Sequence, residues 1–135
     1  MRDILFRGKK ENGEWIEGNL IINNGNPYIV GEVAESNEEY INLEFWYKVI
    51  PETVGQYTGL KDKNGTNIFE GDLMQYQFDN EDNKEFVILF FDGAFCYRYN
   101  HWDLDICPRL TDFQLKNAII IGNIYTNNKA ETEKL

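Results

Sequence analysis

His101 is the only histidine of the chain, and it begins the segment His-Trp-Asp-Leu-Asp that also supplies Asp103 and Asp105. In a β-strand these three polar side chains would share one face, where they could hold a metal ion or support acid-base catalysis. The same spacing is typical of any solvated strand face, and the chain has no second histidine and no Cys-x-x-Cys pair to complete a transition-metal site. We therefore predict no catalytic, cofactor-binding or metal-binding residues. A small enzyme centred on His101 is the least favoured alternative.

Four carboxylates lie close together earlier in the chain, at Asp79, Glu81, Asp82 and Glu85. A calcium loop of the EF-hand type needs a glycine at its sixth position and a glutamate at its twelfth, and this spacing has neither. We interpret the segment as a solvated acidic loop. The sequence also has no P-loop, dinucleotide-binding fingerprint or serine nucleophile elbow, so we expect no cofactor.

Arg98 stands between Tyr97 and Tyr99, and aromatic and guanidinium groups can both stack on a nucleobase. Core packing of the tyrosines beside a surface arginine is the favoured interpretation. The net charge of -10 disfavours direct nucleic-acid binding, which depends on cations at phosphates. The only basic cluster is N-terminal: Arg2, Arg7, Lys9 and Lys10.

Cys96 and Cys107 are the only cysteines, and the first residues show no apolar region or cleavage site of a secretory signal. No run in the chain approaches the roughly 18 apolar residues of a membrane span. We therefore expect a cytoplasmic protein, without a membrane partner, whose cysteines are reduced and buried as small apolar side chains. A disulfide or a reactive thiol is the alternative.

The structural elements are signalled most clearly between Ile50 and Asp72, a segment dense in turn-forming residues. Pro51 predicts the end of a preceding strand. Asn64-Gly65 between apolar runs is typical of a β-hairpin, and Glu70-Gly71-Asp72 predicts a second tight turn. Because turns favour glycine and aspartate, we interpret these residues as setting backbone geometry rather than binding a ligand.

This segment also carries a family resemblance. Its core Val-Gly-Gln-Tyr-Thr-Gly-Leu-Lys-Asp and its ending Ile-Phe-Glu-Gly-Asp, together with Met1–Arg7 and Ile121–Tyr125, resemble the YopX family of phage and prophage proteins. The chain departs from the family pattern after Tyr125, where Thr-Asn-Asn-Lys replaces an Asn-Pro pair. The resemblance implies a mostly β accessory protein of an infected or lysogenic bacterial host. The family has no established activity, so the resemblance transfers no site residues.

Hydrophobic alternation at every second residue, rather than helical periodicity, runs through the first half of the chain. It predicts strands at Ile4–Arg7, Trp15–Ile22, Tyr28–Val30 and Tyr40–Phe45. The polar stretch Glu32–Glu39 is expected to be an exposed loop.

The second half predicts four further strands, at Met74–Phe78, Glu85–Phe91, Ala94–Tyr99 and Ala118–Tyr125. The six consecutive apolar residues Phe86–Phe91 predict a central strand that is covered on both faces. Asp92-Gly93 predicts a tight turn, and Leu110–Lys116 is expected to form one helical turn.

Short strands separated by turns predict an all-β fold, either an antiparallel barrel or a sandwich. We expect residues 1–135 to form one unit. The pattern also permits two subdomains, with β-hairpins over 1–50 packed against an SH3-like barrel over 51–125. Residues 126–135 are expected to be a flexible tail.

The aromatic content of 15% exceeds what a small core needs, and aromatic residues are enriched at protein interfaces. We therefore predict a noncatalytic protein-interaction module whose partner is a host or phage protein. It could also form a homo-oligomer through exposed strand edges. The alternative is a nucleic-acid-linked role, either direct binding or an acidic mimic of DNA that occupies a basic protein surface.

Overall fold

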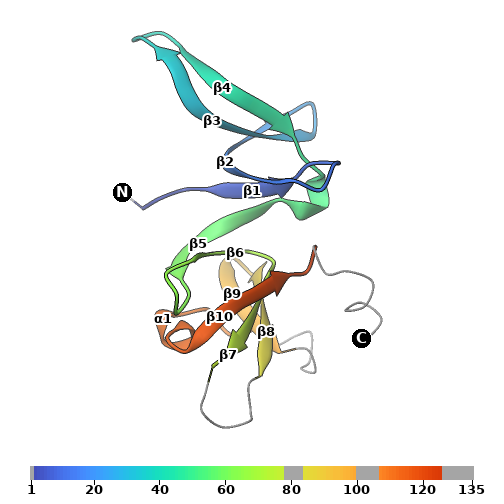
Figure 1. Ribbon diagram of the computed structural model, residues 1–135, viewed down its shortest axis with the longest axis vertical. Helices are drawn as coiled ribbons and strands as arrows, with labels where there is room; N and C mark the ends of the chain where they lie inside the picture. Colours follow the sequence, from blue (N-terminus) through green and yellow to red (C-terminus); the bar gives the residue numbers. More distant parts are fainter. Residues whose placement is uncertain (1, 78–83, 100–106, 126–135) are drawn as a thin grey trace. The chain divides into compact units, whose positions relative to one another are not determined.

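The computed structural model describes residues 2–77, 84–99 and 107–125 (Figure 1). These residues are mostly antiparallel β-strand, which confirms the predicted all-β class. The chain divides into two compact units, Met1–Tyr57 and Thr58–Leu135. The helical turn predicted over Leu110–Lys116 is also present, as the short helix α1 (Asp112–Leu115).

The first unit is one antiparallel sheet in which consecutive strands are joined by turns. The strands follow the order β4-β3-β2-β1-β5, and β5 continues past Tyr57 into the second unit. A 3-10 turn, η1 (Pro51–Thr53), follows β4. The strand before Pro51 therefore ends as the sequence predicts. The bounds are β1 (Phe6–Lys9), β2 (Trp15–Asn23), β3 (Asn26–Ser36), β4 (Ile41–Lys48) and β5 (Gly55–Lys61).

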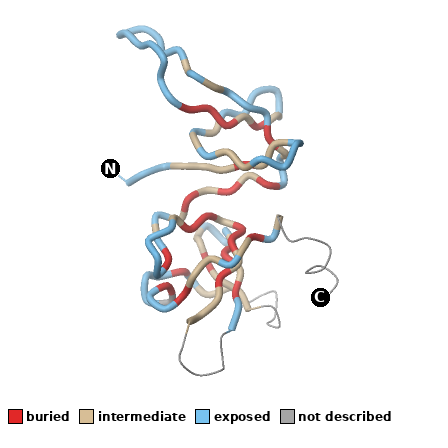
Figure 2. Tube along the Cα trace, viewed as in Figure 1, coloured by how far each residue is buried: buried red, intermediate tan, exposed pale blue. Residues whose placement is uncertain are grey.

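β3 is longer than the alternation predicts. The loop expected over Glu32–Glu39 is wrong for Glu32–Ser36, which belong to β3, although these residues are exposed as predicted (Figure 2). Glu32 has a φ of 51°, and the pairing with β4 shifts register between Val33 and Glu35. A bulge of this kind breaks the two-residue alternation. For that reason the sequence pattern did not predict the end of this strand.

The second unit contains an open four-stranded sheet with the order β10-β7-β8-β9. Its strands are antiparallel, and β6 pairs instead with β5. Within the described residues these strands do not close, so the SH3-like barrel expected over 51–125 is absent there. The bounds are β6 (Asn67–Phe69), β7 (Asp72–Tyr76), β8 (Glu85–Phe91), β9 (Ala94–Tyr99) and β10 (Ala118–Asn123).

The core of the second unit is built where β7 and β8 meet α1 and β10. Its buried members are Ile68, Met74, Phe86, Ile88, Leu110, Leu115 and Ala118. The central position predicted for Phe86–Phe91 is confirmed, since β8 lies between β7 and β9. Coverage on both faces holds only for its first part, because Phe90 and Phe91 are exposed beside the turn at Asp92-Gly93.

Candidate functional site

The side chain of Asp62, in the turn-rich segment that carries the family resemblance, is occupied by backbone hydrogen bonds. Its Oδ1 accepts from the backbone N–H groups of Asn64 (2.8 Å) and Thr66 (2.9 Å), which fixes the turn at Asn64-Gly65. Its Oδ2 accepts from the backbone N–H of Ile120 in β10 (3.1 Å). Asp62 is buried, with a relative exposure of 8%. The carboxylate therefore ties a turn to the last strand and has little capacity left for a ligand.

The second turn of this segment has a similar role. Asp72 is buried, and its Oδ2 accepts from the backbone N–H of Phe69 (2.8 Å). Gly71 adopts a φ of 94°, which favours glycine, and a Cβ there would lie 2.7 Å from the ring of Tyr125. The backbone N–H of Ile124 donates to the Gly71 carbonyl (2.9 Å). Two of the blocks that resemble the YopX family therefore contact each other and build structure.

An aromatic cluster lies around Phe86 in the second unit. Tyr97 and Tyr99 meet the Phe86 ring edge-on, with centroid distances of 5.7 Å and 6.1 Å. The hydroxyl groups of Tyr99 and Tyr76 share a hydrogen bond (3.3 Å). Burial, and then this hydrogen bond, raise the pKa of Tyr76 above its ordinary value of 10.0, so this group stays protonated in alkaline solution where an exposed tyrosine ionises. The tyrosines beside Arg98 pack on the core, as the favoured interpretation expects.

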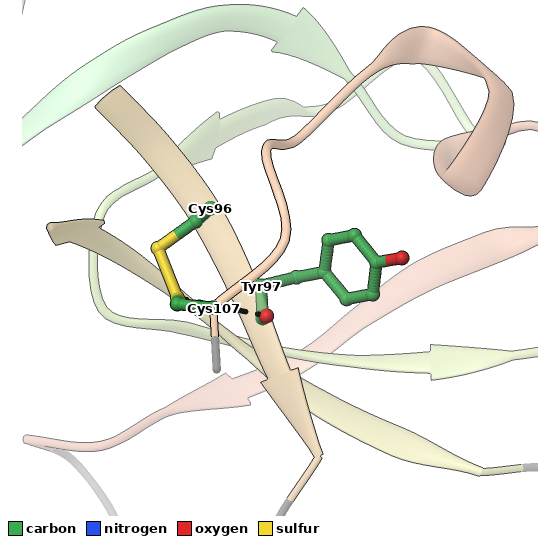
Figure 3. Close-up of a disulfide and its surroundings, with 3 residues drawn as sticks. All are labelled: Cys96, Tyr97 and Cys107. Atoms are coloured by element: carbon green, nitrogen blue, oxygen red, sulfur yellow. Dashed lines mark hydrogen bonds between the residues drawn. A yellow bond between two sulfur atoms is a disulfide. The ribbon is translucent and has the colours of Figure 1, made fainter. Parts of the chain in front are cut away.

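The prediction of reduced cysteines is wrong in this structure. Cys96 and Cys107 form a disulfide with a Cα–Cα distance of 5.5 Å (Figure 3), which lies within the usual range for such bonds. The predicted burial holds for Cys96, which is 1% exposed. The bond joins β9 to the segment before α1, where Leu110 also donates its backbone N–H to the carbonyl of Phe95 (2.9 Å).

Cys107 has a second contact that depends on its oxidation state. Its sulfur lies 3.6 Å from the carbonyl oxygen of Tyr97. A disulfide sulfur carries no hydrogen, so this contact is a hydrogen bond only when Cys107 is a thiol. Both oxidation states of Cys107 therefore have a partner.

The remaining sequence candidates lie largely outside the described residues. His101, Asp103 and Asp105 lie there, and so do Asp79, Glu81 and Asp82 of the acidic loop; Glu85 is exposed at the start of β8. Within the part of the chain that is described, no group of three His, Cys, Asp or Glu side chains could hold a metal ion. The same residues include no helix long and apolar enough to span a membrane.

Part of the N-terminal basic cluster is engaged within the first unit. The Arg7 guanidinium lies 5.0 Å from the centre of the Trp15 ring. Lys10 Nζ lies 3.3 Å from Glu14 Oε2 and 4.3 Å from the centre of the Tyr47 ring. Contacts of these kinds hold the cations against their own sheet. They leave fewer free charges for a phosphate backbone.

Exposed apolar side chains gather on β2, β3 and β4 of the first unit. Trp46 in β4 is 68% exposed, although a large aromatic ring is usually buried. β4 is the last strand of its sheet, and β2 pairs with β3 only as far as Val30. The β3-β4 hairpin therefore continues as a two-stranded arm, defined here as residues 32–44 (Figure 1). The other exposed apolar residues of this region are Ile21 and Ile22 in β2, Val33 in β3, Tyr40 just before β4, and Ile41 and Tyr47 in β4.

Two hollows open on the first unit. One of about 400 Å³ is mainly apolar and lies at the base of the arm, lined by Ile21, Asn23, Tyr28, Val30, Leu43 and Trp46. The other, of about 630 Å³, is lined by Lys10, Glu11, Asn12, Asn26 and the stretch Lys48–Pro51. The sequence predicted surplus aromatic residues but not the position of this surface. The bulge in β3 interrupts the two-residue alternation that would have indicated the arm. The alternation in Tyr40–Phe45 was the one signal that pointed to it.

Comparisons with known proteins agree with the sequence resemblance. The model of the family described as "YopX protein" matches residues 5–130. Among solved structures, the crystal structure of protein EF1440 from Enterococcus faecalis is similar, with a TM-score of 0.65 and 23% sequence identity over 97% of this chain and 99% of that chain. At this identity the likeness concerns the fold alone. No curated protein matches the chain.

Proposed function

The chain belongs to the YopX protein family, and on that premise we propose that it is a noncatalytic protein-interaction module. Its partner would be a host or phage protein in the cytoplasm of an infected or lysogenic bacterium. The observation that carries the proposal is the group of exposed apolar side chains around Trp46, on the sheet edge formed by β4. Exposed aromatic residues beside an apolar hollow are typical of protein interfaces.

Support also comes from buried polar side chains whose hydrogen-bonding groups are used within the fold. Asp62 and Asp72 accept backbone hydrogen bonds, and burial raises the pKa of Tyr76 above that of an ordinary tyrosine. None of these three groups is arranged as a nucleophile or a general base. A His101→Ala variant that lost its biological effect while remaining folded would instead support the enzyme alternative.

The test is an affinity pull-down of the tagged full chain from host lysate, with and without nuclease. A matched pair of variants makes it specific: Trp46→Ser removes the exposed ring on β4, and Phe113→Ser removes a ring in α1 that is also exposed. We expect a nuclease-resistant partner that Trp46→Ser loses and Phe113→Ser keeps. Recovery that disappears with nuclease, or that both variants retain, would contradict the proposal.

An acidic mimic of DNA is the second candidate, because the arm concentrates carboxylates. Residues 32–44 contain Glu32, Glu35, Glu38, Glu39 and Glu44 and no lysine, arginine or histidine. A mimic would capture a basic DNA-binding protein, and added duplex DNA would release it in competition. Partner release by DNA therefore separates mimicry from binding at the apolar surface. Direct nucleic-acid binding is less favoured, given the net charge of -10.

A further inference from the structure

β4 has the properties of an edge that can accept another strand. It ends the sheet order, so in the described residues one side of its backbone faces no neighbouring strand. Natural edge strands are commonly protected by proline, by central lysines or by bulges. β4 has no proline, its only lysine is the last residue, Lys48, and the bulge opposite it lies in β3. The edge is therefore left open to pairing.

The side chains next to this edge supply an apolar contact surface. The hollow of about 400 Å³ is lined in part by Leu43 and Trp46 from β4 and by Val30 from β3. A strand added to β4 would turn alternate side chains toward the face that holds this hollow. Main-chain hydrogen bonds would then supply affinity, and the hollow would select apolar side chains.

Charge decides what kind of strand fits. All five glutamates of the arm are exposed, and one of them, Glu44, belongs to β4 itself. A second copy of the chain would bring a net charge of -10 to this acidic edge, and nucleic acid would bring phosphates. Glu44 stands two residues before Trp46, so both side chains lie on the face of β4 that holds the hollow. A segment that carries a lysine or arginine and an apolar residue two positions apart would present both to this face and complement the arm.

We propose that β4 and its hollow capture an extended segment of a partner protein, by addition as a new edge strand, in which a basic and an apolar residue stand two positions apart and face the hollow side together. This deepens the proposed interaction function and rests on it. The structure supplies the backbone edge, the apolar hollow and the charge, and the partner supplies a strand.

The test uses the full chain and a labelled extended peptide, as long as β4, in which lysine and valine take turns at every second position, so that each face carries both; binding is followed by fluorescence anisotropy. The peptide should bind, and its affinity should fall as the salt concentration rises. Methylating the backbone nitrogens along one edge of the peptide should weaken binding by about tenfold, because main-chain hydrogen bonds are lost. Replacing its lysines with glutamates should abolish binding.

Matched protein variants locate the site. We expect Trp46→Ser and Glu44→Lys each to weaken peptide binding by about fivefold or more. Phe113→Ser and Glu85→Lys, which alter exposed residues of the second unit, should bind as the natural chain does. Absence of peptide binding, equal binding of the methylated peptide, or unchanged binding by Trp46→Ser would each overturn the inference. If the pull-down still yields a partner that depends on Trp46, the interaction function stands and only strand addition fails.

Discussion

Asp62 shows how one carboxylate can hold distant parts of a unit together. It accepts three backbone hydrogen bonds, two within its turn and one from Ile120. Asp62→Ala would leave these donors without their partner, and we expect a loss of about 2–3 kcal/mol in the free energy of unfolding. Chemical denaturation measures it. Lys63→Ala, at the exposed next position, should change stability little, and equal effects of the two would contradict the role given to the carboxylate.

Gly71 is constrained both by its backbone angle and by the Tyr125 ring. We expect Gly71→Ala to destabilise the protein more than Gly65→Ala, whose φ is 83° but which has open space around the added Cβ. The conformational part alone costs about 1–2 kcal/mol at either position. Thermal unfolding of both variants separates the two contributions. In a Tyr125→Ala background the difference between them should vanish, and a persistent difference would exclude contact with the ring as its cause.

Tyr76 predicts a loss of stability in alkali. Its pKa is raised in the folded protein, so above pH 10 the unfolded state releases this proton while the folded state keeps it. The unfolded state then binds fewer protons, and stability falls as pH rises, whereas below this range the contribution is constant. Denaturant midpoints measured from pH 8 to pH 11 should decline less for Tyr76→Phe. An identical decline in both proteins would assign the alkaline loss to other groups.

At the scale of elements, the disulfide is a covalent link between β9 and the segment before α1. Cys96 and Cys107 are separated by 11 residues, and closing a loop of this length stabilises a fold by about 3 kcal/mol. We expect air-purified protein, denatured without reductant, to gain no mass from iodoacetamide. Reductant should permit two additions and lower the denaturant midpoint. Full alkylation without reductant would show that the cysteines are thiols.

Local chemistry made most elements predictable. The turns at Asn64-Gly65 and Asp92-Gly93, and the strands around them, follow from residues adjacent in sequence. The arm was missed because Glu32 adopts a φ of 51° and the bulge after it interrupts the alternation.

Long-range pairings could not be predicted in the same way. The bond from Ile120 to Asp62 and the disulfide each depend on which segments meet in space. The exposed apolar surface around Trp46 was predictable only as an excess of aromatic residues. Its position required the knowledge that β4 is a sheet edge.

At the scale of the whole molecule, charge opposes self-association through the arm. Two copies paired at β4 would each carry a net charge of -10, and salt screens such repulsion over about 10 Å at 0.1 M. We therefore expect any homo-oligomer to strengthen as salt rises. A basic partner should show the opposite dependence. Sedimentation velocity across a salt series measures both, and a homodimer favoured by low salt would contradict this reasoning.

The position of β10 has a consequence for synthesis. The residues of the first unit have all been made once the ribosome passes Tyr57, whereas β7 receives one of its two neighbours only when Ala118–Asn123 emerge. A nascent chain that stops before β10 leaves one edge of β7 without its paired strand. Asp62 then lacks the hydrogen bond from the backbone N–H of Ile120. A chain that ends before β10 therefore cannot complete the fold of the second unit, and cellular quality control would meet it as an incompletely folded protein.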